Sequence, residues 1–199
     1  MGTPKAMVEV AGLPMVSRIV STVGSAGLEP VVVAKPDSEL PRLDCRVLAE
    51  PAEPRHPLTG LIAALNTSAG RGVVAIACDM PLVPAKLLHW LAQIEEEVAV
   101  CEVGGRLEPF LGRYSPTATE ALSAALTDGA AMRDAVSALD PYVIVEEKIA
   151  RFGDPASIVF SVNAPEDVER AEDLLARAGG RMRSLRPMLS RFGTEGRAG

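Results

Sequence analysis

Runs of apolar residues of strand length recur along the chain and predict the strands of a buried sheet. Strands are expected at 30–34, 45–49, 72–77, 142–147 and 157–162, with a further one at 6–10 and two extended pieces within 98–114. The run "GVVAIA" at 72–77 is apolar throughout and rich in β-branched residues, which is typical of a central strand covered on both faces.

Between these runs, apolar residues return every three or four positions, which is the spacing of one face of a helix. Helices are predicted at 15–26, from about Thr59, from Pro84, at 115–126, at 131–139 and after Asn163. Thr59 is a candidate cap for its helix, and Asn163 with Glu166 has the spacing of a capping box at the start of the last one.

The regular alternation of strands and helices is the pattern of parallel βαβ units, so an α/β fold is expected. A chain of 199 residues suits one domain, which we place at residues 1–180. Residues 181–199 carry five arginines against one glutamate and are predicted to be a mobile basic tail.

The charge distribution bears on the kind of partner. Residues 1–180 carry 15 basic and 25 acidic side chains, a net charge of −10, which argues against nucleic acid as the main partner. The longest apolar runs are far shorter than the roughly 20 residues of a membrane span, so no membrane partner is expected. Cys45, Cys78 and Cys101 lack metal-site spacing, and we predict reduced thiols in a cytoplasmic protein.

The sharpest chemical signal is "AIACDMPLV", where an apolar strand delivers Asp79 at its carboxyl end. Ligands bind at that end of strands in open α/β sheets, and a carboxylate there suits a hard cation such as Mg²⁺ beside a phosphate. Position alone allows a second interpretation equally well, in which Asp79 only caps the turn before Pro84.

Two further segments fit a phosphate or nucleotide site. Lys5 follows Gly2 and precedes the strand predicted at 6–10, so its ammonium group is placed to reach phosphates or to remain in solvent. In "HPLTGLIAAL" a turn and Gly60 stand at a helix start, where free N–H groups suit an anion, although an ordinary capped helix gives the same pattern. Neither G-x-x-x-x-G-K-[ST] nor a strand followed by G-x-G-x-x-G occurs.

In this order, the segments "MGTPKAMVEVAGLPM", "HPLTGLIAAL", "AIACDMPLVP", "EPFLGRY" and "SVNAPEDVERAE" resemble the MobA-like nucleotidyltransferases, and specifically the enzymes that guanylylate the molybdenum cofactor. The resemblance runs from Met1 to about Ala176. It implies a three-layer Rossmann-like fold with a mostly parallel central sheet. It also implies transfer of GMP from GTP to molybdenum-molybdopterin, with release of pyrophosphate.

The resemblance also assigns roles to residues. It implies that Asp79 holds Mg²⁺ and that Lys5 stabilises charge on the triphosphate, so these two residues are the expected catalytic groups. Nucleotide contacts are implied for Gly2, Lys5, Glu50, Gly60 and Asp79, and a contact on the pterin side for Asn163. Molybdoenzyme assembly proteins are a further partner class that the resemblance suggests.

Three features depart from the family pattern. His56 replaces a glycine, Ala34 stands where a polar residue can contact the nucleotide, and the L-A-G-G segment of the family is not present ahead of Gly2. We expect the native chain to begin earlier by about 10 to 20 residues, enough for one strand and a turn. Two other functions stay open: a cytidylyltransferase or other NTP transferase, and a binding module without catalysis.

Overall fold

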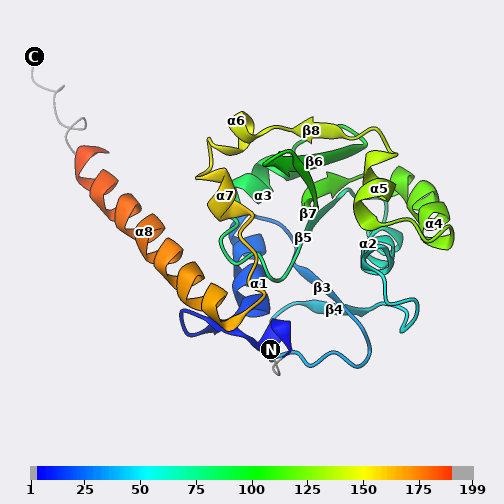
Figure 1. Cartoon of the computed structure of the whole chain (residues 1–199), viewed down its shortest axis with the longest axis horizontal. Helices are drawn as coiled ribbons and strands as arrows, with labels where there is room; N and C mark the ends of the chain where they lie inside the picture. The colour runs from blue at the N-terminus through cyan, green and yellow to red at the C-terminus, as the bar shows by residue number, and fades with distance from the viewer. Residues whose placement is uncertain (1–3, 190–199) are drawn as a thin grey trace, which may run out of the picture.

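The computed structural model describes the backbone of residues 4–189 and the side chains of residues 4–177 (Figure 1). Its strands are β1 (Glu9–Val10), β2 (Leu13–Pro14), β3 (Val31–Ala34), β4 (Arg46–Ala49), β5 (Val73–Ile76), β6 (Val98–Val103), β7 (Arg106–Tyr114) and β8 (Tyr142–Ile144). The α-helices are α1 (Met15–Ser25), α2 (Pro57–Asn66), α3 (Ala85–Ala92), α4 (Thr119–Thr127), α5 (Met132–Ser137), α6 (Glu146–Ile149), α7 (Pro155–Ile158) and α8 (Pro165–Leu189). Short 3-10 helices are η1 (Lys5–Met7) and η2 (Pro116–Ala118).

The largest sheet has four strands in the order β5-β7-β6-β8. β7 is antiparallel to both β5 and β6, while β6 and β8 are parallel, so β7 alone runs against the other three. β3 and β4 form a separate parallel pair, and β1 and β2 a short hairpin. The expected α/β fold with a mostly parallel sheet is therefore confirmed, with β7 as the reversed strand.

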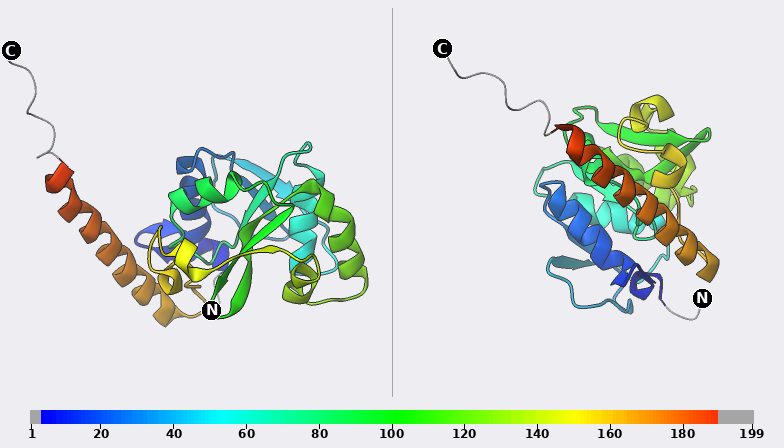
Figure 2. Two further views of the ribbon diagram at one scale, coloured as in Figure 1. Left: turned by 90° about the horizontal axis from the view of Figure 1, so that it is seen from above. Right: turned by 90° about the vertical axis from the view of Figure 1, so that its left-hand side faces the viewer.

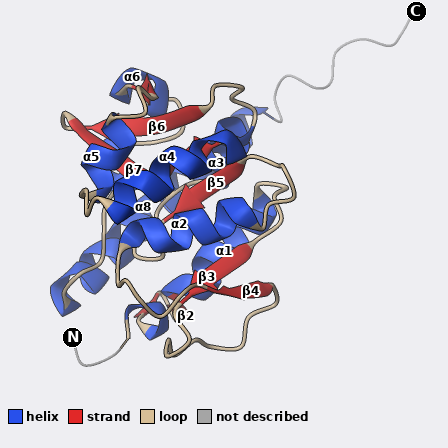
Figure 3. Ribbon diagram, turned by 90° about the vertical axis from the view of Figure 1, so that its right-hand side faces the viewer, coloured by secondary structure: helices blue, strands red, loops and turns tan. Residues whose placement is uncertain are grey.

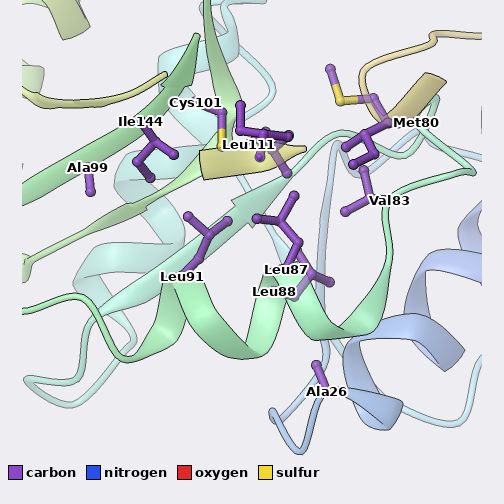
Figure 4. Packing of buried hydrophobic residues seen from close by; sticks show 12 residues of the cluster. Ala26, Met80, Val83, Leu87, Leu88, Leu91, Ala99, Cys101, Leu111 and Ile144 are labelled. Atoms are coloured by element: carbon purple, nitrogen blue, oxygen red, sulfur yellow. The ribbon is translucent and has the colours of Figure 1, made fainter. Parts of the chain in front are cut away.

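Helices cover both faces of the four-stranded sheet, which gives three layers. Successive residues of β6 point to opposite faces, as in any strand: Ala99 and Cys101 pack against α3, whereas Val98 and Val100 pack on the side of α2, α4 and α5. Figure 4 shows the hydrophobic core on the α3 side of the sheet, where Leu87 and Leu91 of α3 reach toward the strands. The carboxyl ends of the strands are thus held on a core that is packed on both sides.

The final helix, α8, has its own small contact surface. Ala171 of α8 and Val162 just before it pack with Val8, Val10 and Met15, and the helix then continues away from the body of the protein (Figure 2). No described helix is long and apolar enough to span a membrane. The division into a domain at residues 1–180 and a basic tail stays a prediction, and residues 190–199 lie outside the described part.

Two predicted strands are wrong. Residues 157–162 were expected to be extended, but α7 begins at Pro155 with the Asp154 carboxylate accepting the N–H of Ser157, and a loop follows. Ile158 lies in α7 and Val162 in the loop that follows, and both side chains are buried. The apolar residues of this segment therefore serve core packing and do not form a strand. At 6–10 the chain forms η1 and only the two-residue strand β1.

The start of α2 also differs from the prediction. The helix begins at Pro57, and the ring of His56 caps it by accepting the N–H of Leu58 at 3.2 Å. Thr59, the expected cap, lies inside the helix and donates its hydroxyl to the carbonyl oxygens of Pro54 and His56. A proline at the first helical position has no N–H to satisfy, which explains the earlier start.

Candidate functional site

Asp79 lies just past the carboxyl end of β5, as the sequence predicted. The ladder continues one step beyond the strand, because Ala77 donates its N–H to the carbonyl oxygen of Phe110 on β7. The carbonyl oxygen of Asp79 in turn accepts the N–H of Val162 at 2.9 Å. The segment from Ala77 to Asp79 is therefore held from two sides, and the Asp79 side chain stays 20% exposed.

The structure brings together three of the predicted site residues, which we call the Lys5 cluster: Lys5, Asp79 and Asn163. Lys5 Nζ donates to Asp79 Oδ2 at 3.1 Å and to Asn163 Oδ1 at 2.5 Å. The residues come from η1, from the end of β5 and from the turn before α8, which are far apart in the sequence. The Asp79 carboxylate binds Lys5 and does not cap the turn before Pro84, so the second interpretation of this residue is wrong.

Asn163 is positioned by the first turn of α8. The Asp167 carboxylate accepts the N–H groups of Asn163 and Ala164, both at 2.8 Å. These hydrogen bonds lower the pKa of Asp167 below its ordinary value. The expected capping role of Glu166 is therefore wrong, because Asp167 closes this turn and leaves the amide oxygen of Asn163 free to bind Lys5.

The geometry of the Lys5 cluster suits a cation. Asp79 Oδ2 and Asn163 Oδ1 converge on one ammonium group, which occupies the place that a metal ion between the two oxygens would take. Carboxylate and amide oxygens are hard ligands of the kind Mg²⁺ prefers. No three His, Cys, Asp or Glu side chains gather at a metal site within the described part of the chain, so phosphate or water would complete the coordination.

Glu108 of β7 is a charged neighbour that the sequence analysis did not single out. Its pKa is raised, first by partial burial and also by the negative charge of Asp79, while Arg133 at 3.9 Å acts in the opposite direction. The Glu108 side chain is 18% exposed. The sequence showed Glu108 only as part of the motif "EPFLGRY". Its proximity to Asp79 could not be predicted, because no local pattern indicates that β7 pairs with β5.

A second group of charges lies at the carboxyl ends of β3 and β4. Glu50 follows β4 directly and Lys35 follows β3, and their charged atoms are 3.6 Å apart, with both side chains 13% exposed. Glu50 Oε2 is buried and accepts no hydrogen bond from any described residue. Lys35 was not predicted, although a lysine directly after the apolar run "VVVA" is the signal that could have identified it.

Gly60 of α2 lies against this second group. A Cβ atom at Gly60 would come within 3.3 Å of Glu50 Oε2, so glycine gives the carboxylate its room. Glu50 and Gly60 belong to one group and Lys5, Asp79 and Asn163 to another. Gly2, the remaining predicted residue, lies outside the described residues.

A cavity of about 700 Å³ runs between β3 and β5. Its lining includes Glu50, His56 and Gly60 at one end, together with Cys78 beside Asp79. Burial raises the pKa of the Cys78 thiol, and the neighbouring Asp79 charge adds to this, so the thiol stays protonated at neutral pH. The cavity thus connects the Glu50 group with the residue preceding the Lys5 cluster.

Charged groups gather at the carboxyl ends of β3, β4 and β5, which is the edge where open α/β sheets generally bind ligands. Residues 1–142 match the model of the MobA-like NTP transferase domain, and the chain belongs to this family.

The relatives agree with this membership. The chain is 34% identical over 183 residues to a molybdenum cofactor guanylyltransferase of Cereibacter sphaeroides, an alignment that covers 88% of this chain and 90% of the relative. It is 29% identical to a probable molybdenum cofactor guanylyltransferase of Pelotomaculum thermopropionicum, with 86% and 85% of the two chains covered.

Solved structures agree on the fold. Molybdopterin-guanine dinucleotide biosynthesis protein A from Archaeoglobus fulgidus superposes with a TM-score of 0.73 at 21% identity, covering 88% of this chain and 92% of the other. The 2-C-methyl-D-erythritol 4-phosphate cytidylyltransferase of Thermus thermophilus gives 0.64 at 20% identity, covering 87% and 94%. The Rossmann-like nucleotidyltransferase architecture expected from the sequence is therefore confirmed.

Proposed function

We propose that this protein transfers GMP from GTP to molybdenum-molybdopterin, forming the guanine dinucleotide cofactor and pyrophosphate. The observation that carries the proposal is the Lys5 cluster at the carboxyl end of β5, in a chain 34% identical to a molybdenum cofactor guanylyltransferase over nearly its whole length. Both the cluster and the Glu50 group stand where open α/β sheets bind ligands.

The chemistry is a substitution at phosphorus. An oxygen of the terminal phosphate of molybdopterin attacks the α-phosphorus of GTP, the bond from that phosphorus to the bridging oxygen breaks, and pyrophosphate carries away the electron pair. Such a reaction needs positioning and neutralisation of charge more than covalent help from the protein. Lys5 supplies a positive charge next to Asp79 for this purpose.

Asp79 is the residue that would hold Mg²⁺, with the amide oxygen of Asn163 as the second protein oxygen pointing to the same place. When bound there, Mg²⁺ would neutralise charge on the phosphate oxygens. Lys5 now fills that place, so its ammonium would move from the two oxygens onto the triphosphate. Its side chain is 47% exposed, which leaves it room to do so.

Glu50 and Gly60 would border the nucleotide base. Glu50 Oε2 is a buried acceptor without a hydrogen bond in the described structure, and base N–H groups are donors that match it. Gly2 remains an expected contact to the triphosphate, and Asn163 also an expected contact on the pterin side. The cytoplasm remains the predicted compartment, because three free cysteines suit reducing surroundings. Molybdoenzyme assembly proteins remain a predicted class of partner.

The test compares nucleotides directly. The protein is incubated with molybdenum-molybdopterin, Mg²⁺ and either GTP or CTP, and dinucleotide and pyrophosphate are measured. We expect turnover with GTP and, at equal concentration, little with CTP. Turnover with CTP alone would instead assign the protein to the cytidylyltransferases.

A further inference from the structure

Glu108 of β7 is a largely buried carboxylate whose capacity to accept hydrogen bonds is unused. Its side chain is 18% exposed and accepts no hydrogen bond from residues 4–177, the range in which the structure describes side chains. Arg133 is its ion-pair partner, but Arg133 Nη2 lies 3.9 Å from Glu108 Oε1, which is beyond hydrogen-bond distance. Withdrawing a carboxylate from water without giving it donors is costly, so Glu108 suits a ligand that supplies N–H groups.

Glu108 lies beside Asp79 at one edge of the sheet. Beyond the ladder of β5 and β7, Ala77 donates its N–H to the carbonyl oxygen of Phe110. Because the two strands are antiparallel, Asp79 lies two residues past this bond on one strand and Glu108 two residues past it on the other. Burial raises the pKa of Glu108 and the charge of Asp79 adds to this, which agrees with their proximity. Glu108 is therefore a neighbour of the Lys5 cluster.

Arg133 is fixed next to Glu108 by the backbone of β7. Its Nε donates to the carbonyl oxygen of Leu107 at 2.9 Å, and α5, which carries Arg133, lies beside β7 (Figure 3). The Arg133 side chain is 47% exposed, and its remaining N–H groups donate to no other side chain or carbonyl among the described residues. A ligand at this place would meet the two acceptor oxygens of a carboxylate next to guanidinium donors.

This arrangement of groups complements one edge of a 2-amino-4-oxo pyrimidine ring. The amino group and the adjacent ring N–H donate to the two oxygens of a carboxylate, and the neighbouring oxo group accepts from a guanidinium. Guanine and the pterin ring of molybdopterin both carry this edge. Glu50 and Lys35 form another carboxylate–cation pair, so the described part of the chain offers one such pair for each ring.

The two pairs lie on opposite sides of Asp79. Glu50 follows β4, Asp79 follows β5 and Glu108 belongs to β7. Figure 3 shows β4, β3, β5 and β7 in this order across the molecule. A reaction that joins two such rings through their phosphates needs one ring on each side of the reacting phosphorus. With Glu50 bordering the guanine, the Glu108 pair is available for the pterin.

We propose that Glu108 is a specificity-determining residue for the acceptor substrate. Its carboxylate binds the 2-amino group and the adjacent ring N–H of the pterin, and Arg133 binds the 4-oxo group. Glu108 thereby selects against pteridines with an oxygen at position 2, because that oxygen would face the carboxylate. The inference rests on the proposed guanylyl transfer, since that reaction supplies the pterin substrate.

The test measures binding of pterin and of lumazine, a pteridine with an oxygen in place of the 2-amino group, by fluorescence titration without nucleotide. We expect the native protein to bind pterin at least about tenfold more tightly than lumazine. Glu108→Gln should weaken pterin binding by about tenfold and remove the preference, because the amide N–H can donate to the 2-oxygen of lumazine. The control is Glu120→Gln in the first turn of α4, which follows the other end of β7 and should change neither affinity.

Equal affinities of the native protein for the two pteridines, or an unchanged preference in Glu108→Gln, would overturn the inference. Steady-state kinetics separate it from the proposed function. Glu108→Gln should raise the KM for molybdenum-molybdopterin about tenfold and leave the KM for GTP unchanged. Turnover with both KM values unchanged would contradict the role of Glu108 and leave guanylyl transfer intact. Glu108-dependent pterin binding by a protein that forms no dinucleotide would support the pterin contact and contradict guanylyl transfer.

Discussion

At the scale of single residues, two oxygen acceptors share one ammonium group. Lys5 lies between the oxygens of Asp79 and Asn163, and it is the more exposed member of the pair it forms with Asp79. Exposed ion pairs stabilise folded proteins little, because solvent already screens both charges. The contact is therefore better explained by what Lys5 does for a phosphate than by stability.

Lys5→Met separates these two roles. We expect the transfer rate to fall by about 100-fold, the usual scale for losing a group that stabilises transition-state charge. We expect the free energy of unfolding to change by less than about 1 kcal/mol, since the pair is exposed. Steady-state kinetics and urea unfolding of the two proteins measure both quantities. A loss of stability as large as the loss of activity would contradict this separation.

Gly60→Ala tests the nucleotide side of the site. The new Cβ atom would lie 3.3 Å from Glu50 Oε2, so the carboxylate must shift. We expect weaker GTP binding, on the order of tenfold, which corresponds to one disturbed hydrogen bond to a charged group.

The matched control for Gly60→Ala is Gly24→Ala in α1, where an added Cβ meets nothing within 4 Å. This change should leave GTP binding unaltered and stabilise the helix by roughly 0.5–1 kcal/mol. Calorimetric titration with GTP compares the variants. Equal affinities for Gly60→Ala and Gly24→Ala would argue against a nucleotide contact beside Glu50.

At the scale of elements, the first turn of α8 decides where Asn163 points. Sequence spacing identified Asn163 and the helix start, but it assigned the wrong acidic residue. Glu166 and Asp167 are neighbours with the same charge, and local pattern does not distinguish them. The choice of Asp167 depends on the shape of the turn that follows the Val162 to Asp79 hydrogen bond, which is a contact between distant parts of the chain.

Asp167→Asn should loosen this turn. The two hydrogen bonds lower the pKa of Asp167 in the folded state below its ordinary value of 3.8, so its stabilising contribution is complete above pH 3.8 and is lost as the pH falls through the lowered value. We expect lower protection factors, which are exchange rates relative to the intrinsic rate at the same pH, for the amides of Asn163 and Ala164 in the variant at pH 7, and in the native protein only in acid. NMR exchange rates measure both.

The control for Asp167→Asn is Glu166→Gln, whose side chain makes no hydrogen bond within the described residues. It should leave the exchange of both amides unchanged. Similar effects of the two substitutions would mean that general charge at the helix start, and not the Asp167 hydrogen bonds, fixes the position of Asn163.

At the scale of the whole molecule, hydrophobic periodicity predicted most elements because each buries apolar side chains in one of the protein's hydrophobic cores. The apolar runs at 30–34 and 72–77 became β3 and β5, and the periodic segment at 15–26 became α1. Strand order was not predictable in this way. β5 pairs with β7 and not with β6, its nearer neighbour in sequence, and a pattern of local residues carries no information on such pairing.

The sequence singled out several candidate site residues but not how they group in space. Asp79 stood out because a lone carboxylate ended an apolar strand, Lys5 was a candidate phosphate contact by its position after Gly2, and Asn163 received a site role only through the family resemblance. Only the fold shows that these three side chains meet, and that Glu50, Gly60 and Lys35 form a second group. Residues at the ends of different strands become neighbours through the sheet, so their proximity follows from topology.

In the proposed reaction, Asp79 at the end of β5 supports transfer of GMP from GTP. The most direct test is the rate of dinucleotide formation from GTP, Mg²⁺ and molybdenum-molybdopterin by Asp79→Asn, with Asp128→Asn at the exposed end of α4 as the control. We predict a loss of about 100-fold or more for Asp79→Asn and none for the control. An Asp79→Asn protein that turns over as fast as the native enzyme would contradict the account.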